Sequence, residues 1–205
     1  MIRIVDYGMG NLGSILNLCR YLDLPAGLCR TPEEIARAER LILPGVGSFD
    51  SATRKLAELG LDQAIRQAHF SGKIPLLGIC LGMQLLCDSS EEGLTTGLGL
   101  IRGRALRIVP PAEGVERLLV PHMGWNTVTQ RPESRLLANL PQDPRFYFVH
   151  SYHVVCDDSA DRAATVQYGS PLTAAIERGL VFGTQFHPEK SHRFGMQVIR
   201  NFSKL

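Results

Sequence analysis

The segment IPLLGICLGMQ, residues 74–84, decides the fold because it places a strand directly before a helix with a cysteine at the junction. The apolar run Ile74–Ile79 predicts a buried strand, and the residues after Cys80 have helical spacing. Gly78 and Gly82 complete the pattern G-x-C-x-G, the thiol form of the nucleophile elbow. Such a corner lifts the thiol out of the sheet edge, and a helix N-terminus favours the thiolate. The segment therefore predicts an α/β fold with a candidate nucleophile, and a buried structural cysteine is the alternative.

The rest of the chain extends this strand-and-helix pattern. In the first half the predicted strands are Ile2–Val5, Ala26–Cys29 and Leu41–Leu43, and the predicted helices are Leu12–Leu22, a short helix from Pro32, and Phe49–Phe70 with a break near Gly60. This alternation favours a mostly parallel central sheet flanked by helices. In the second half the predicted strands are Leu100–Val109, Gly124–Thr129, Arg145–Val155, Ala163–Tyr168, Thr173–Glu177 and Val181–Phe186, separated by turns such as Pro110-Pro111 and followed by a helix at Gly195–Phe202. Their hairpin-like connections predict antiparallel strands, and a chain of 205 residues fits one domain, 1–205.

Composition excludes several classes of function. A net charge of +2 gives no reason to expect nucleic acid or a membrane surface as a partner. No apolar stretch approaches the roughly 20 residues of a membrane span, and the first residues enter a strand pattern without a signal peptide. The five cysteines form no C-x-x-C pair and no metal-ligand spacing, so we expect no metal, and reduced thiols in the cytoplasm.

A candidate partner for the cysteine lies near the C-terminus, in the segment FHPEKS, residues 186–191. His187 and Glu189 are two residues apart, so extended backbone would project both side chains to the same side. A histidine base needs an acceptor that fixes its tautomer, and a carboxylate provides one. Together with Cys80 this predicts a Cys–His–Glu triad, against the alternative of a solvated turn. The segment Pro44–Gly47, after the third predicted strand, could offer a second backbone N–H to an oxyanion.

A competing signal lies at the start of the chain, where Gly8, Gly10 and Gly13 form G-x-G-x-x-G between a predicted strand and helix. This is the fingerprint of a dinucleotide-binding loop, and Arg30 ends the second strand, where a 2′-phosphate partner could lie. The alternative is that the glycines permit a tight turn or close backbone packing. Because the chemistry elsewhere points away from a cofactor, we expect none.

The elbow GICLGMQ and the segment FHPEKS resemble the class I (triad-type) glutamine amidotransferases. Four further segments narrow the resemblance: DYGMGNL at 6–12, PGVG at 44–47, PHMGWN at 121–126 and HSYH at 150–153. They resemble the members of this family that supply ammonia to a cyclase in histidine biosynthesis. The likeness runs over essentially the whole chain and implies a flavodoxin-like fold. Gly13-Ser14 departs from the larger or charged residues that members often carry there.

The resemblance also implies roles for individual residues. Cys80 would attack the side-chain amide of glutamine, His187 would move the protons, and Glu189 would orient His187. The remaining predicted positions are the oxyanion groups Leu81, Val46 and Gly47; the glutamine-binding residues Gln84, Glu92, Ser151 and Tyr152; and the interface residues Asn11, His122, Trp125, Asn126, Tyr147 and Lys190. The implied partner is a (β/α)₈-barrel cyclase subunit, which would form a heterodimer with this chain.

Three other functions remain open at this point. The chain could be the glutaminase subunit of another synthase, of the pyridoxal phosphate, anthranilate or formylglycinamidine type. It could be a nucleotide-binding oxidoreductase that uses Gly8, Gly10 and Gly13. It could also be a binding module without catalytic activity, although the presence of Cys80 and His187 argues against that.

Overall fold

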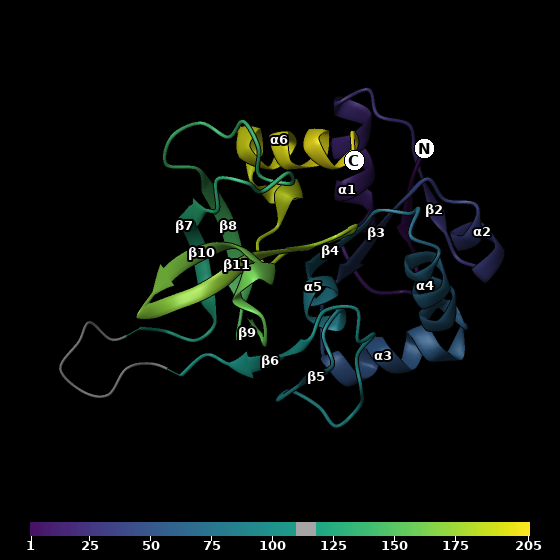
Figure 1. Ribbon diagram of the computed structural model, residues 1–205, viewed down its shortest axis with the longest axis horizontal. Helices are drawn as coiled ribbons and strands as arrows, with labels where there is room; N and C mark the ends of the chain where they lie inside the picture. Colours follow the sequence, from purple (N-terminus) through teal and green to yellow (C-terminus); the bar gives the residue numbers. More distant parts are fainter. Residues whose placement is uncertain (110–117) are drawn as a thin grey trace.

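The computed structural model describes residues 1–109 and 118–205, and the predicted turn at Pro110-Pro111 lies outside these ranges. Within them, nine strands form one sheet in the order β2-β1-β3-β4-β12-β11-β10-β7-β8 (Figure 1). These strands are β1 (Ile2–Val5), β2 (Ala26–Cys29), β3 (Arg40–Gly45), β4 (Leu76–Cys80), β7 (His122–Gln130), β8 (Arg145–His150), β10 (Arg162–Tyr168), β11 (Ser170–Arg178) and β12 (Val181–Thr184).

The sheet changes character at β12. The pairs among β2, β1, β3, β4 and β12 are all parallel, and the pairs from β12 through to β8 are all antiparallel. This confirms the predicted parallel first half and antiparallel second half. The parallel pair β4–β12 aligns Ile79 with Thr184. Both strands therefore end at the same edge, which brings the residues after β12 beside Cys80.

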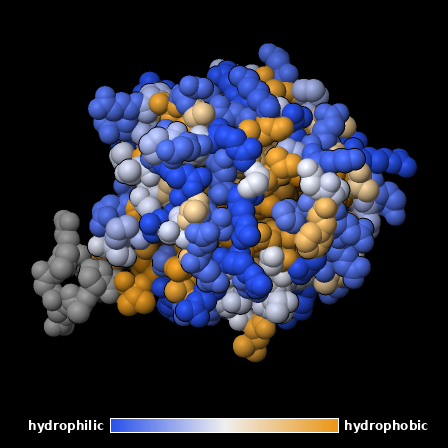
Figure 2. All heavy atoms as spheres, viewed as in Figure 1, coloured by the Kyte–Doolittle hydropathy of each residue, from blue (hydrophilic) through white to orange (hydrophobic). Residues whose placement is uncertain are grey.

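Helices cover both faces of the parallel half. On one face lie α1 (Leu12–Tyr21) and α6 (His192–Phe202); on the other lie α2 (Pro32–Ala36), α3 (Phe49–Glu58), α4 (Leu61–Phe70) and α5 (Leu81–Leu85) (Figure 1). The strands alternate between two cores, because Ile42 and Leu77 pack with the first layer while Leu43 and Leu76 pack with the second. Gly60, with φ +66°, separates α3 from α4 as predicted. The face of the molecule drawn in Figure 2, which is viewed as in Figure 1, is mostly hydrophilic, with hydrophobic residues gathered near its centre.

A second, three-stranded sheet was not predicted. It consists of β5 (Ser89–Ser90), β6 (Gly103–Arg107) and β9 (Tyr152–Cys156). The prediction of a single strand over Arg145–Val155 is wrong, because the chain leaves the large sheet at Ser151 and enters the small one as β9. The break keeps the alternation in phase: Phe146, Phe148 and Val154 are all buried, so periodicity alone cannot locate it.

The N-terminal glycine loop follows β1 at the same edge of the sheet as Cys80. Gly10, with φ +113°, would place a Cβ 3.1 Å from the Pro44 side chain, so this glycine permits a close approach between the glycine loop and the end of β3. Gly13 is different, because it lies inside α1 and a Cβ there would meet nothing within 4 Å. The expectation of close packing is therefore confirmed at Gly10 and wrong at Gly13. Arg30 donates to Asp6 at 2.7 Å, so its guanidinium is already paired within the chain.

Candidate active site

Cys80 occupies a strained corner between β4 and α5. Its φ of 55° and ψ of −110° lie outside the regions that residues other than glycine favour. Strain of this kind typically costs about 1–3 kcal/mol and persists only where the surrounding packing imposes it. The geometry matches the elbow that the G-x-C-x-G pattern predicts.

Backbone packing around glycines imposes that corner. A Cβ at Gly82 would lie 1.8 Å from the Leu43 carbonyl oxygen, and one at Gly78 would lie 2.6 Å from the Gly82 carbonyl oxygen. Gly45, the last residue of β3, would meet the Gly82 nitrogen at 2.9 Å. The ends of β3, β4 and α5 are thus in direct backbone contact, and only glycine fits at these places.

His187 and Glu189 form a buried pair. The Nδ1 of His187 lies 2.8 Å from Oε1 of Glu189, and the two side chains are 3% and 2% exposed. The prediction that extended backbone brings these two side chains together is only partly correct. His187 itself is extended, but residues Pro188–Lys190 form a 3₁₀ turn, η2, that folds the carboxylate back. Because an ionised carboxylate only accepts hydrogen bonds, Nδ1 carries the proton and Nε2 is left for the reaction.

Charge balance around His187 favours its protonated form. Burial lowers the pKa of the imidazole, but hydrogen bonding and charge from Cys80 and Glu189 outweigh burial and raise the pKa to about 9. Nε2 nevertheless has no partner that meets full hydrogen-bond geometry among the described residues. Nucleophile and base are often this loosely placed in an empty active site and tighten when substrate binds.

Two buried residues that sequence reasoning missed hold the triad. The Ser191 hydroxyl donates to the His187 carbonyl at 2.6 Å and accepts from the Tyr147 N–H at 3.0 Å, which fixes the turn against β8. Gln185 is fully buried, and its Nε2 lies 3.8 Å from the Cys80 sulfur. Ser191 ends the segment 186–191 and Gln185 directly precedes it, so proximity to His187 in the chain was the available signal.

Cys80 and His187 line a cavity of about 360 Å³, within the usual size range of small-molecule sites. All the predicted oxyanion and glutamine-binding residues line this cavity: Val46, Gly47, Leu81, Gln84, Glu92, Ser151 and Tyr152. The rest of its lining consists of Pro121, Val149, His150 and Lys190. Gln84 directs its amide nitrogen into the protein, to the Tyr152 carbonyl at 3.1 Å and to Gln185 Oε1 at 3.2 Å. It therefore holds the wall of the cavity rather than offering this donor to a ligand.

The candidate oxyanion groups come from two segments that line the cavity. Leu81 begins α5, so its N–H is one of the helix donors that lack an intrahelical partner. Val46 and Gly47 follow β3, whose last residue Gly45 packs against Leu81, and Gly47 has φ +103°, a conformation open mainly to glycine. Tyr7 donates to the Pro44 carbonyl at 2.8 Å and so fixes the start of this loop.

His122 does not lie on the surface, contrary to what its predicted interface role requires. It is 2% exposed because the alternation of β7 turns it inward with Asn126, while Met123 and Trp125 point outward and are 62% and 40% exposed. Sequence reasoning missed Met123, which the same alternation could have identified.

A hydrogen-bonded chain runs from His122 to the cavity wall. Nδ1 of His122 lies 2.9 Å from Nε2 of His150, and Nδ1 of His150 lies 2.8 Å from the Tyr152 carbonyl. That carbonyl can only accept, so His150 donates from Nδ1, and its Nε2 accepts the hydrogen bond that His122 donates from Nδ1. Burial lowers the pKa of His122 to about 4 and that of His150 to about 3, so both rings are neutral at pH 7. The Nδ2 of Asn126 completes the chain at 3.4 Å from His122 Nε2.

An aromatic surface lies beside the cavity. Trp125 stacks on His192 with ring centroids 5.3 Å apart and meets Tyr147 edge-on at 6.2 Å. The Lys190 ammonium lies 5.6 Å from the centroid of the Tyr147 ring. Asn11, the residue before α1, is half-buried at the end of the glycine loop. Partly exposed aromatic and basic side chains of this kind are typical of protein interfaces.

Residues 1–109 and 118–205 contain neither a cluster of metal ligands nor a membrane-spanning helix. No group of three His, Cys, Asp or Glu side chains is arranged to bind a metal ion. No helix in these ranges combines the length and hydrophobicity that crossing a bilayer requires.

Comparison with known proteins gives consistent matches. The sequence matches the family Glutamine amidotransferase class-I over residues 3–205. It is 45% identical to the imidazole glycerol phosphate synthase subunit HisH of Leptospira borgpetersenii, with 100% of both chains covered. It is 47% identical to HisH 2 of Methanococcus maripaludis, with 100% of this chain and 99% of the relative covered. Among solved structures, PurLQS from Thermotoga maritima superposes with a TM-score of 0.73 at 19% identity, covering 99% of this chain and 97% of that one, which shows a shared fold.

Proposed function

The chain belongs to the class I glutamine amidotransferase family, and from this premise we propose that it is the glutaminase subunit of an imidazole glycerol phosphate synthase. It hydrolyses glutamine to glutamate and ammonia. The ammonia serves a cyclase that makes imidazole glycerol phosphate and aminoimidazole carboxamide ribotide in histidine biosynthesis. The observation that carries this proposal is the 45% identity to such a subunit over the full length of both chains. The cavity that joins Cys80 to the His187–Glu189 pair supplies the chemistry.

The first half of the reaction forms a thioester. The Cys80 thiolate adds to the side-chain carbonyl carbon of glutamine, and the carbonyl oxygen becomes an oxyanion next to the Leu81 N–H and the Val46–Gly47 backbone. Protonated His187 then donates from Nε2 to the amide nitrogen, the C–N bond breaks, and ammonia leaves. Glu189 holds Nδ1 at 2.8 Å and stabilises the imidazolium until that transfer.

The second half releases glutamate. His187 is now neutral and accepts a proton from water through Nε2, while the water oxygen adds to the thioester carbon. When the C–S bond breaks, Cys80 leaves as the thiolate and His187 is again protonated. The thiolate–imidazolium pair is thereby restored, which agrees with the raised pKa of His187.

A subunit of a synthase implies a partner subunit. We propose a (β/α)₈-barrel cyclase that forms a heterodimer with this chain and covers the aromatic surface of Met123, Trp125, Tyr147 and Lys190 beside the cavity mouth. Direct transfer protects the ammonia, which would be protonated in bulk water and lose its nucleophilicity. The five cysteines are free thiols, which fits a reducing compartment, and we place the protein in the cytoplasm.

The pH dependence of the glutaminase reaction tests the charge state of the pair. We expect kcat/KM for glutamine to fall as pH rises through about 9, because His187 then loses the proton that ammonia release needs. Glu189→Gln removes a carboxylate that raises this pKa, so its alkaline limb should move to lower pH. The measurement is glutamate formation by the assembled complex between pH 7 and 10.5. An alkaline limb that stays in place in Glu189→Gln would contradict the assignment.

One experiment tests the proposed function directly. Glutamate formation is measured for the isolated chain, and then with the cyclase and the cyclase substrate. We expect low activity alone and a large increase in the complex, because the Val46–Gly47 loop lines the cavity and the Val46 side chain is exposed, where a partner subunit can contact it. Full turnover by the isolated chain would refute control by the partner.

Two further experiments test the alternative functions. Recovery of a different synthase subunit in a pull-down would favour the alternative synthases, and micromolar binding of NAD(P) would favour an oxidoreductase.

A further inference from the structure

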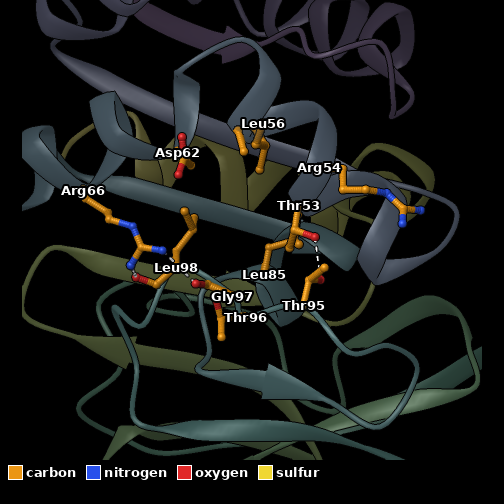
Figure 3. A pocket seen from close by; sticks show the side chains of 11 residues that line it. Thr53, Arg54, Leu56, Asp62, Arg66, Leu85, Thr95, Thr96, Gly97 and Leu98 are labelled. Atoms are coloured by element: carbon orange, nitrogen blue, oxygen red, sulfur yellow. Dashed lines mark hydrogen bonds between the residues drawn. The ribbon is translucent and has the colours of Figure 1, made fainter.

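The loop of residues 91–98 lies against α3 and α4 and is hydrogen-bonded to both helices. Arg66 on α4 donates to the carbonyls of Gly97, at 2.8 Å, and Leu98. Thr53 on α3 contacts Thr95 through their hydroxyl oxygens, 2.6 Å apart (Figure 3). A cavity of about 200 Å³ lies between the loop and these helices. The Thr53–Thr95 contact and the hydrogen bonds of Arg66 span this cavity and hold the loop to α3 and α4.

Asp50, in the first turn of α3, is the centre of these contacts. Its Oδ1 accepts three hydrogen bonds: from the N–H of Leu94 at 3.0 Å, the N–H of Thr95 at 3.1 Å and the Thr95 hydroxyl at 2.7 Å. The Thr95 hydroxyl donates its hydrogen bond to this carboxylate, so the Thr53 hydroxyl is the donor in the contact between the two hydroxyls. Gly93 completes the fit, because a Cβ there would lie 1.9 Å from Asp50 Oδ1.

Glu92, the residue before Gly93, connects this loop to the active site. Its Oε2 accepts from the Phe49 N–H at 2.8 Å, and Phe49 is the first residue of α3. Ser48, at the N-cap position, makes no side-chain cap bond to the helix, so Glu92 acts as the cap from another segment. Val46 and Gly47 immediately precede that helix start, and they line the same cavity as Glu92.

We propose that Asp50 is a positioning residue for glutamine, which fixes loop 91–98 on α3 so that Glu92 is held in the cavity beside the Val46–Gly47 loop. This inference rests on the proposed glutaminase function. Glu92 is the carboxylate in the cavity wall that can pair with the α-ammonium group of glutamine. Asp50 touches no reacting atom and acts only through the loop.

The consequence is a selective loss of glutamine affinity. Asp50→Ala removes one acceptor from three donors, which frees residues 93–95 and with them Glu92. We expect the KM for glutamine to rise about 10- to 100-fold, the range for losing one charged hydrogen bond, with kcat changed less than about threefold. Ammonia-dependent synthesis by the same complex should be unchanged, because it bypasses the glutamine cavity.

The experiment uses the assembled two-subunit enzyme and three variants at α3. Asp50→Asn keeps an acceptor oxygen and should restore the KM to within about threefold of wild type. Glu58→Ala removes an exposed carboxylate from the other end of α3 and serves as the matched control. If Asp50→Ala fails to fold, as judged by its thermal transition, Thr95→Val removes the hydroxyl contacts with Asp50 and Thr53, keeps the backbone bond to Asp50, and should raise the KM about threefold.

The outcomes separate the two proposals. A KM for glutamine that stays at the wild-type value in Asp50→Ala or in folded Thr95→Val overturns the positioning role. Equal losses of glutamine-dependent and ammonia-dependent synthesis overturn it too, since they indicate general destabilisation. A wild-type complex that forms no glutamate from glutamine contradicts the proposed function instead.

Discussion

Cys80→Ala is expected to abolish glutamine-dependent synthesis while ammonia-dependent synthesis by the assembled complex continues. The sulfur is the atom that forms the thioester, and no other described side chain in the cavity is a thiol. Removing a nucleophile that acts as a unit with its base typically lowers kcat by about 10⁶-fold. Ammonia supplied in the buffer bypasses this step and reaches the cyclase directly. The measurement compares product formation with glutamine and with ammonium salt at equal pH.

A second cysteine provides the control. Cys156 is half-buried in β9, and burial raises the pKa of its thiol to about 11, so it is protonated near neutral pH. Cys156→Ala should leave both activities intact, and an electrophilic glutamine analogue should label Cys80 alone. Loss of both activities in Cys80→Ala with an intact complex would contradict the assigned division of labour between the subunits.

The parts of the site that the sequence predicted are those encoded locally. The corner at Cys80 depends on Gly78 and Gly82, two residues away on either side, so a short pattern contains the whole geometry. His187 and Glu189 are likewise close in the chain, and their pairing was predicted even though the intervening backbone is a 3₁₀ turn. The prediction paired the two segments because a nucleophilic cysteine needs a histidine base. In the structure the parallel register of β4 and β12 brings them together.

The parts that the sequence did not predict depend on contacts between distant segments. Asp50 meets Thr95 across 45 residues, and Gln185 meets Cys80 across 105, so neither contact leaves a local pattern. The family resemblance implied an interface role for His122, whereas the alternation of β7 buries it. The break at Ser151 was missed because it preserves the alternation of buried side chains on either side.

Gly82→Ala should both destabilise the chain and remove glutaminase activity. A Cβ at this position would lie 1.8 Å from the Leu43 carbonyl oxygen, and backbone cannot give way as a flexible side chain can. Moving α5 away from β3 should cost about 3 kcal/mol, which lowers the Tm of a chain this size by about 6–12 °C. The same shift displaces Cys80 from the oxyanion groups, and a misplacement of about 1 Å can lower the rate about 100-fold. Thermal unfolding and glutamate formation by the complex measure the two effects.

Gly13→Ala is the matched control, because both glycines lie in helices and only their surroundings differ. Nothing lies within 4 Å of a Cβ at Gly13, and its φ is not positive. Alanine is favoured over glycine inside a helix by about 1 kcal/mol, so this variant should raise the Tm of the isolated chain by about 2–4 °C. If Gly82→Ala instead unfolded at the wild-type temperature, the close approach of α5 to β3 would not constrain the elbow. If Gly13→Ala lowered the Tm, the third glycine of G-x-G-x-x-G would have a structural role that its open surroundings do not explain.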